Sequence, residues 1–207
     1  NMCAITLLYK EGYFRQRVDE EGIQIETYPR FDPDPLLKKT KIKFTLRLKE
    51  RNIWVQVYKF DYIGQNGSKI PIYFLDTDVE ENLEADRTIS LRLYSGDKDH
   101  RILQEAVLGF GGMKLLDSLK QNEIKKYHMN EGHCSFLVLS LYEKFSGNIE
   151  VVKSKCHFTT HTPVPAGHDH FSLKRVKNLL SEFIPDELEL PSLIQKGRLH
   201  MTELGLS

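Results

Sequence analysis

Three times after residue 88, a short apolar segment is followed by a polar loop and then by apolar residues at helical spacing. The three repeats cover residues 89–119, 126–145 and 156–183. Strands that alternate with helices in this way pair in parallel, because each helix carries the chain back across the sheet. The sequence therefore predicts a parallel sheet with helices on its faces in residues 89–207.

Residues 1–88 follow a different pattern. Apolar and polar side chains alternate there, a period of two that is typical of strands with one solvated face. The segment "YPRFDPDP" contains three prolines and is expected to be a loop. The predicted strands are residues 13–19, 23–28, 41–48, 53–62 and 69–76. We therefore expect a β-rich, mainly antiparallel part in 1–88, and one incomplete α/β domain over residues 1–207.

Composition narrows the classes of partner. Lys and Arg (29) balance Asp and Glu (29), so no net charge favours nucleic acid or an anionic membrane. The three cysteines are far apart and form no C-x-x-C, which argues against disulfides and against a cysteine zinc site. No apolar run approaches the roughly 18 residues of a membrane helix. We expect a cytoplasmic protein that binds neither nucleic acid nor membrane.

The predicted parallel sheet also locates a candidate site. In open α/β sheets the ligand binds outside the carboxyl ends of the strands, where the strand-to-helix loops gather. Those loops are residues 95–99, 130–133 and 161–167, and helix amino termini behind them favour partial negative charge on a ligand. The polar residues in or next to them are Asp97, Lys98, Glu131, His133, His161, His168 and Asp169. The residues alone indicate a crevice for a small polar ligand.

Two alternative interpretations concern the same residues. His157 and His161 are spaced as a metal pair only on a helix, whereas residues 158–160 favour a strand and no H-E-x-x-H is present. We therefore expect no metal site. The "NEGH" segment can also be read as a carboxylate that satisfies a helix start. "GFGG" lies within a predicted helix and lacks the third glycine of a dinucleotide motif, which favours a packing role.

Five blocks in one order carry a family resemblance. They are "LLYKEGYFRQRVDEEGIQIETYP", "PIYFLDTDVEENLEADRTISLRLYSGD", "HRILQEAVLGFGG", "YHMNEGHCSFLVLSLY" and "FTTHTPVPAGHDHF". Together they resemble the α-glucan (glycogen, starch or maltodextrin) phosphorylases, most closely their bacterial and archaeal branch. The resemblance runs from about Leu7 to the last residue.

The resemblance implies a fold and an activity. The fold is part of the Rossmann-like N-terminal domain of a two-domain, GT-B type glycosyltransferase. The activity is phosphorolysis of α-1,4-glucan to glucose 1-phosphate with pyridoxal phosphate as cofactor. Its transition state resembles an oxocarbenium ion in a closed cleft, where fixed dipoles and hydrogen bonds to sugar hydroxyls supply stabilisation.

The resemblance also implies roles for individual residues. The histidine of the family's H-T-x-x-P block, here His161, hydrogen-bonds the 6-hydroxyl of the reacting ring, and its carbonyl faces the developing positive charge. Glu131 matches the pocket-lining aspartate of the animal-type N-D-x-H block and is one carbon longer. We therefore expect His161 and Glu131 to be catalytic. The substrate-binding residues are expected to be Thr162, His133, Asn130 and Tyr94, the last by stacking on sugar.

The relatives in this family are several times longer than this chain. Their cofactor lysine and phosphate-binding residues belong to a second, C-terminal domain, so no cofactor-binding residue is expected here. We expect the chain to supply the sugar-side half of the active site, to be inactive alone, and to self-associate through an exposed sheet edge. The alternative is a standalone carbohydrate-binding or regulatory module without catalysis.

Overall fold

The computed structural model describes residues 2–93, 95–121, 123–184, 194–195 and 197–206. The protein is a mixed α/β structure that divides into two compact units. The first contains Asn1–Lys43 and Trp54–Ser95, and the second contains Phe44–Ile53 and Gly96–Ser207. The long hairpin of β4 and β5 contributes its tip, residues 44–53, to the second unit.

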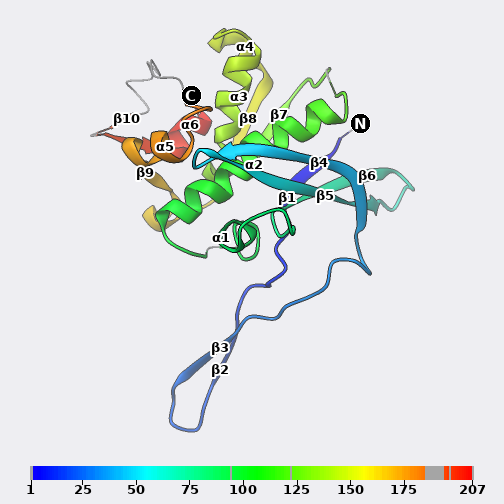
Figure 1. The fold of residues 1–207 in the computed structure, drawn as a ribbon, viewed down its shortest axis with the longest axis vertical. Coiled ribbons are helices and arrows are strands. Elements are labelled where there is room, and N and C mark those ends of the chain that lie inside the picture. The colour runs from blue at the N-terminus through cyan, green and yellow to red at the C-terminus, as the bar shows by residue number, and fades with distance from the viewer. Residues whose placement is uncertain (1, 94, 122, 185–193, 196, 207) are drawn as a thin grey trace. The chain divides into compact units, whose positions relative to one another are not determined.

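A four-stranded sheet has the order β1-β6-β5-β4 (Figure 1). β5 pairs antiparallel with β6, which confirms the predicted strands at 53–62 and 69–76, while β1 pairs with β6 in parallel. Ile53, Val55 and Val57 of β5 are fully buried, and burial also extends to Gln56 and Tyr58 between and beside them, so the alternation of the sequence is only partly repeated in the burial. The bounds of these strands are β1 (Ala4–Leu7), β4 (Lys38–Leu48), β5 (Arg51–Ile63) and β6 (Lys69–Asp76).

The predicted hairpin at residues 13–28 is confirmed. β2 (Arg15–Val18) pairs antiparallel with β3 (Gln24–Thr27), seen in blue in Figure 1. Asp19 organises the turn by accepting a hydrogen bond from the Ile23 amide at 2.7 Å. Nearly every residue of both strands is exposed, so the hairpin depends on backbone pairing and its turn more than on a core.

The strand predicted to begin at residue 89 is wrong over residues 89–93, because the structure describes them as turns with one isolated bridge residue. Two residues far apart in sequence explain this. The Thr77 amide donates to the Ser90 hydroxyl at 2.9 Å, and the Ser90 amide donates to the Thr77 hydroxyl at 3.1 Å. These buried side-chain bonds replace a strand ladder. The preceding segment contains the one-turn helix α1 (Glu84–Arg87).

The second unit confirms the helices predicted at 101–119 and 134–145 and the strands predicted at 126–129 and 156–160. β7 and β8 pair in parallel, the only parallel pair described in this unit. α4 was not predicted, and the helix expected after residue 169 is shorter and follows a three-residue strand. In chain order the elements are α2 (Lys98–Ser118), β7 (Tyr127–Asn130), the 3₁₀ helix η1 (Gly132–Cys134), α3 (Phe136–Lys144), α4 (Ile149–Lys155), β8 (Cys156–Thr159), the 3₁₀ helix η2 (Pro165–Gly167), β9 (His170–Ser172), α5 (Leu173–Leu179), β10 (Ile194–Gln195), β11 (Arg198–His200) and α6 (Met201–Leu206).

Close packing of α2 against the start of α3 forms the centre of this unit. A Cβ atom on Gly109 would lie 2.8 Å from the backbone nitrogen of Leu137 and 2.8 Å from Cβ of Phe136. The rings of Phe110 and Phe136 stack with centroids 5.3 Å apart. The first glycine of "GFGG" therefore has the packing role that its helical position predicts, because only glycine permits this approach.

Candidate functional site

The candidate site begins where β7 and β8 end. Asn130 and Thr159 are the last partners in the parallel register, and the next residue, Glu131, extends the pairing by donating its amide to the Thr159 carbonyl at 2.8 Å. Parallel strands end at the same edge of a sheet. The loops that begin at residues 131 and 160 therefore lie side by side, as the strand-loop-helix pattern predicts.

The carboxylate of Glu131 is the centre of this arrangement. Its Oε1 accepts from the backbone amide of His161 at 2.8 Å, from the Thr162 amide at 3.1 Å and from the Thr162 hydroxyl at 3.0 Å. Its Oε2 accepts from the Thr160 hydroxyl at 3.0 Å. One buried side chain thus binds three consecutive residues of the opposite loop. Charge-assisted hydrogen bonds of this kind are about twice as strong as neutral ones.

The backbone of Glu131 is strained. Its φ of 68° and ψ of 168° fall in a region that is essentially reserved for glycine. Such a conformation costs of the order of 1–3 kcal/mol and persists only where the surroundings impose it. Here the four hydrogen bonds to the carboxylate and the one from the amide impose it.

Burial alone would raise the pKa of Glu131, but hydrogen bonds oppose it. The amide of His161, then the hydroxyls of Thr162 and Thr160, hold the pKa of this carboxyl below its ordinary value. Glu131 is therefore an anion at neutral pH. This charge state suits an acceptor that binds four donors and has no proton to give.

The hydrogen bonds to Glu131 also fix the direction of two peptide groups. Peptide bonds are planar and the described chain contains no cis bond, so each carbonyl points opposite to the amide of the same peptide group. The amides of His161 and Thr162 point at Glu131. The carbonyls of Thr160 and His161 must therefore point away from the carboxylate.

The imidazole of His161 is held on one side and open on the other. Its Nδ1 lies 3.2 Å from Oε1 of Glu131, and its side chain is 66% exposed. The loop thus presents an exposed imidazole that can contact a ligand hydroxyl.

The other predicted site residues have different surroundings. His133 is half-buried on η1, and burial, helped by the positive charge of Arg101, lowers its pKa. Asn130 is exposed at the end of β7. Tyr94 lies outside the described residues. The structure therefore brings His161, Thr162 and Glu131 into direct contact, and gives Asn130 and His133 places in the adjoining segment.

Two residues that contact this site were not predicted. Thr160 binds Glu131, and the repeated hydroxyls of "TTHT" were the signal that could have identified it. Arg101 on α2 binds Asp169 at the far end of the same loop, with 2.6 Å between Nη2 and Oδ2. Nothing in the sequence indicates this second pair, because 68 residues separate its members.

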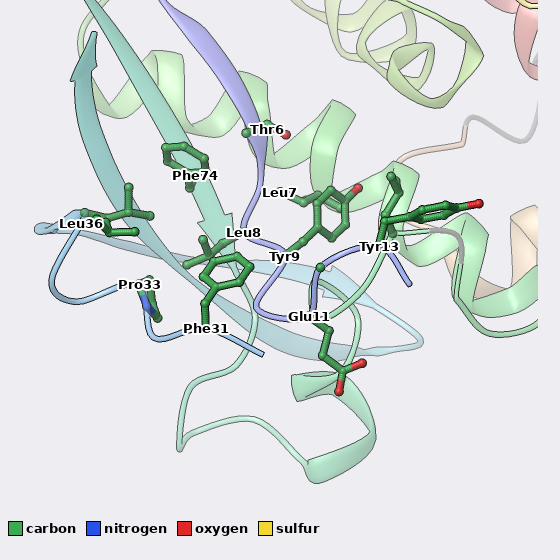
Figure 2. Close-up of a pocket in the computed structure, with 13 residues that line it drawn as sticks. Thr6, Leu7, Leu8, Tyr9, Glu11, Tyr13, Phe31, Pro33, Leu36 and Phe74 are labelled. Atoms are coloured by element: carbon green, nitrogen blue, oxygen red, sulfur yellow. The ribbon is translucent and has the colours of Figure 1, made fainter. Parts of the chain in front are cut away.

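The first unit contains an apolar pocket of about 370 Å³. Figure 2 shows Leu8, Phe31, Leu36 and Phe74 around it. The one carboxylate in its lining, that of Glu11, accepts a hydrogen bond from Arg30 Nε at 2.7 Å. None of the described residues that line this pocket is a predicted site residue. It is a separate apolar feature of the first unit.

Metal binding and membrane insertion find no support in the described residues. No group of three or more His, Cys, Asp or Glu side chains among them is arranged to hold a metal ion. Within the same residues, no helix is both long and apolar enough to cross a membrane.

The fold and site define an α/β protein in which two parallel strands present a histidine-bearing loop organised by a buried carboxylate. In sequence, the chain is 38% identical over 197 residues to the maltodextrin phosphorylase of Thermococcus litoralis. The alignment covers 88% of this chain and 23% of that protein. It is 35% identical over 206 residues to the glycogen phosphorylase of Mycobacterium tuberculosis, covering 87% and 23%. No protein-family model matches the chain.

A third relative is an uncharacterized protein of Methanocaldococcus jannaschii, 34% identical over 180 residues, with 86% of this chain and 33% of that protein covered. The resemblance to the glycogen and maltodextrin phosphorylases is therefore confirmed. The chain spans about a quarter of the length of these named phosphorylases, since 23% of each is covered.

Proposed function

We propose that this chain supplies the sugar-side half of the active site of an α-1,4-glucan phosphorylase. In this proposal it is part of the Rossmann-like N-terminal domain of a GT-B type glycosyltransferase. The observation that carries the proposal is the binding of the His161 and Thr162 amides by Glu131. The names of the relatives supply the reaction class, the phosphorolysis of glycogen or maltodextrin.

The geometry suits a glucosyl ring that develops positive charge. The carbonyl of His161 points away from Glu131 and offers a fixed dipole whose negative end can face the anomeric carbon. A dipole that is already oriented costs no reorganisation during the reaction. The exposed imidazole of His161 can contact a sugar hydroxyl, while Asn130 and His133 supply polar groups beside it. In this arrangement Glu131 acts through His161, by holding the loop.

Pyridoxal phosphate is the cofactor that the family resemblance implies, and it supplies the phosphate group that assists proton transfer there. The described residues do not fit its attachment. A Schiff base needs a lysine that can be desolvated. No lysine is among the buried residues of the described chain, and none lies in the segments 130–135 and 160–169 around Glu131 and His161. No step of the proposal is therefore assigned to the cofactor.

In this proposal the 207-residue chain is inactive alone. The reason is that the loop around His161 does not bind the substrate phosphate. The test is incubation with maltodextrin, inorganic phosphate and pyridoxal phosphate, followed by an assay for glucose 1-phosphate. Release no faster than the protein-free control is expected. Turnover above that control contradicts this part of the proposal.

A chimera tests the functional assignment directly. The segment of the Thermococcus litoralis maltodextrin phosphorylase that aligns with this chain is replaced by this chain's residues. The chimera should release glucose 1-phosphate, and His161→Ala in it should lower kcat/KM roughly 100-fold, as for loss of one oriented catalytic group. His157→Ala on β8 is the matched control and should leave activity unchanged. A chimera that remains fully active with His161→Ala refutes the role of the loop.

Binding measurements separate this proposal from a standalone carbohydrate-binding module. Maltoheptaose is titrated into the chain and into its His161→Ala variant by calorimetry. A half-site should give little or no saturable heat with either protein. Saturable binding that His161→Ala weakens favours the module instead.

A further inference from the structure

The loop that presents His161 is held at a second point, at its far end. There Arg101 Nη2 lies 2.6 Å from Oδ2 of Asp169, and the Asp169 carbonyl accepts from the Met201 amide at 3.0 Å. His168 adds a contact between its Nδ1 and the Thr202 hydroxyl at 2.9 Å. Residues 160–162 and 168–169 are thus both anchored, and His161, with its exposed ring, belongs to the first of these two segments.

A second carboxyl group shares the same guanidinium. Oε1 of Glu105 lies 3.3 Å from Nη2 of Arg101, the nitrogen that binds Asp169 at the shorter distance. The Glu105 side chain is 1% exposed, and its Oε2 has no hydrogen-bond partner among the described residues. With Asp169 already paired to this guanidinium, an ionised Glu105 would be a second anion on it and would itself be almost fully buried, which is costly.

We propose that Glu105 is a positioning residue for the His161 loop: buried as the carboxylic acid, it leaves the charge of Arg101 to Asp169 and so fixes the far end of the loop. Three observations carry this inference: Glu105 and Asp169 share the guanidinium of Arg101, Oε2 of Glu105 has no hydrogen-bond partner among the described residues, and the Glu105 side chain is buried. The inference rests on the proposed function in one respect only, the contact of the loop with a ligand.

The charged and titratable groups around Glu105 agree with an uncharged state. Burial raises the pKa of Glu105 well above its ordinary value, the negative charge of Asp169 raises it further, and Arg101 opposes both. A hydrogen bond with the Asp169 side chain also raises the pKa, as expected for a protonated Glu105 that donates to the Asp169 carboxylate. Cys134 faces it from η1, and burial raises the pKa of that thiol to about 11, so this side supplies no charge at neutral pH. His133 lies close to Arg101 and Asp169, and its pKa is lowered by burial and by Arg101.

This arrangement predicts how anchoring of the loop depends on pH. A carboxyl whose pKa is raised on folding stabilises the folded protein fully below its unfolded pKa, and this contribution disappears as the pH rises through the folded pKa. Deprotonation of Glu105 would place a second anion beside Arg101. The Arg101 contact of Asp169 should therefore weaken at alkaline pH, and with it the Met201 amide bond to Asp169.

Hydrogen exchange at single amides, measured on the full chain from acidic to alkaline pH, tests the inference. The reporter is the protection factor of the Met201 amide, the ratio of its intrinsic to its observed exchange rate. Glu105→Gln, an uncharged isostere, should keep the neutral-pH protection within about twofold and remove its decline at alkaline pH, whereas Glu105→Ala should lower it about tenfold or more. Glu143→Gln, an exposed glutamate on α3, is the matched control.

The outcomes are distinct. Rescue by glutamine but not by alanine, together with loss of the alkaline decline, supports the positioning role. An ion-pairing glutamate would not be rescued by glutamine, and a merely space-filling glutamate would give no pH dependence for glutamine to remove. Equal losses of Met201 protection in both variants at neutral pH would show that the ionised carboxylate is required and would overturn the inference. Unchanged protection in both variants would also overturn it. None of these readouts requires glucan, so a failure of the proposed function in the chimera would be recognised separately.

Discussion

The carboxylate of Glu131 lies 2.8 Å from the backbone nitrogen of His161, although thirty positions separate them in the sequence. This contact joins the ends of two neighbouring parallel strands and sets the direction in which the His161 carbonyl points. The residue that matched a pocket-lining acid by resemblance therefore has its acceptor sites occupied by the protein itself. A carboxylate that already binds four donors is better suited to holding a catalytic loop than to contacting sugar.

Replacing Glu131 with glutamine should destabilise the second unit by about 1–3 kcal/mol, because charge-assisted bonds to residues 160–162 are lost. The pH dependence has a defined sign. The pKa of Glu131 is lowered in the folded protein, so its contribution is present above the ordinary pKa of about 4.3 and disappears as the pH falls through the folded value. Urea unfolding at several pH values measures both effects.

In Glu131→Gln, this part of the acid dependence should be absent, and the two proteins should converge in stability at low pH. Glu143→Gln again serves as the control and should change stability by less than about 0.5 kcal/mol. Equal stability of Glu131→Gln and the parent protein at neutral pH would contradict the structural role given to this carboxylate.

Replacing Gly109 with alanine should destabilise the contact between α2 and α3 by about 1–3 kcal/mol. The added carbon would lie 2.8 Å from the Leu137 nitrogen, which is backbone and cannot rotate away. At Gly64 the nearest atom to an added carbon is the side-chain Oδ1 of Asn66 at 3.3 Å, so Gly64→Ala is the milder comparison. Thermal unfolding followed by circular dichroism should show the larger loss for Gly109→Ala, and an equal or smaller loss would disprove the close approach.

The thiol of Cys134 should be the slowest of the three cysteines to alkylate. Burial raises its pKa to about 11, against an ordinary value of 9.0, which leaves about a hundredfold less thiolate at neutral pH. Timed labelling with iodoacetamide, with each site quantified by mass spectrometry, should give rates for Cys134 well below those of Cys3 and Cys156. Labelling of Cys134 at the same rate as the others would be inconsistent with its burial.

Exposed apolar side chains of the first unit should cause self-association. Phe60 and Tyr62 are 42% and 53% exposed on one face of β5, and Leu36, in the lining of the apolar pocket, is 69% exposed. Large exposed apolar side chains are typical of contact sites. Light scattering over a concentration series should show a rising mass, and the Phe60→Lys, Tyr62→Lys double variant should reduce it.

Val18→Lys on the exposed hairpin is the control for added charge and should leave the mass curve unchanged. A parent protein that remains monomeric across the whole series would contradict this prediction. From the sequence, self-association was expected to occur at an exposed sheet edge. The sheet has β1 at one end of its order, so an unpaired strand edge is available as a second contact.

Local sequence patterns predicted most of the secondary structure, and their failures have physical explanations. Alternation placed β5 and β6, and helical spacing placed α2 and α3, because each pattern already encodes which side chains can be buried together. The segment at 89–93 looked like a strand by the same criterion. Buried hydrogen bonds between Thr77 and Ser90 hold it as turns instead, and a pairing across thirteen positions leaves no local signal.

By itself, the sequence determined where β5, β6, α2 and α3 lie, the two loops that follow β7 and β8, and the phosphorylase resemblance carried by residues in those loops. Tertiary structure alone decided that Glu131 binds the His161 loop from within and that Arg101 is shared by Asp169 and Glu105. The reason is that periodicity records only which face of a segment is buried. Which carboxylate receives which donor depends on distances of about 3 Å between residues far apart in the chain, and these exist only after the strands have paired.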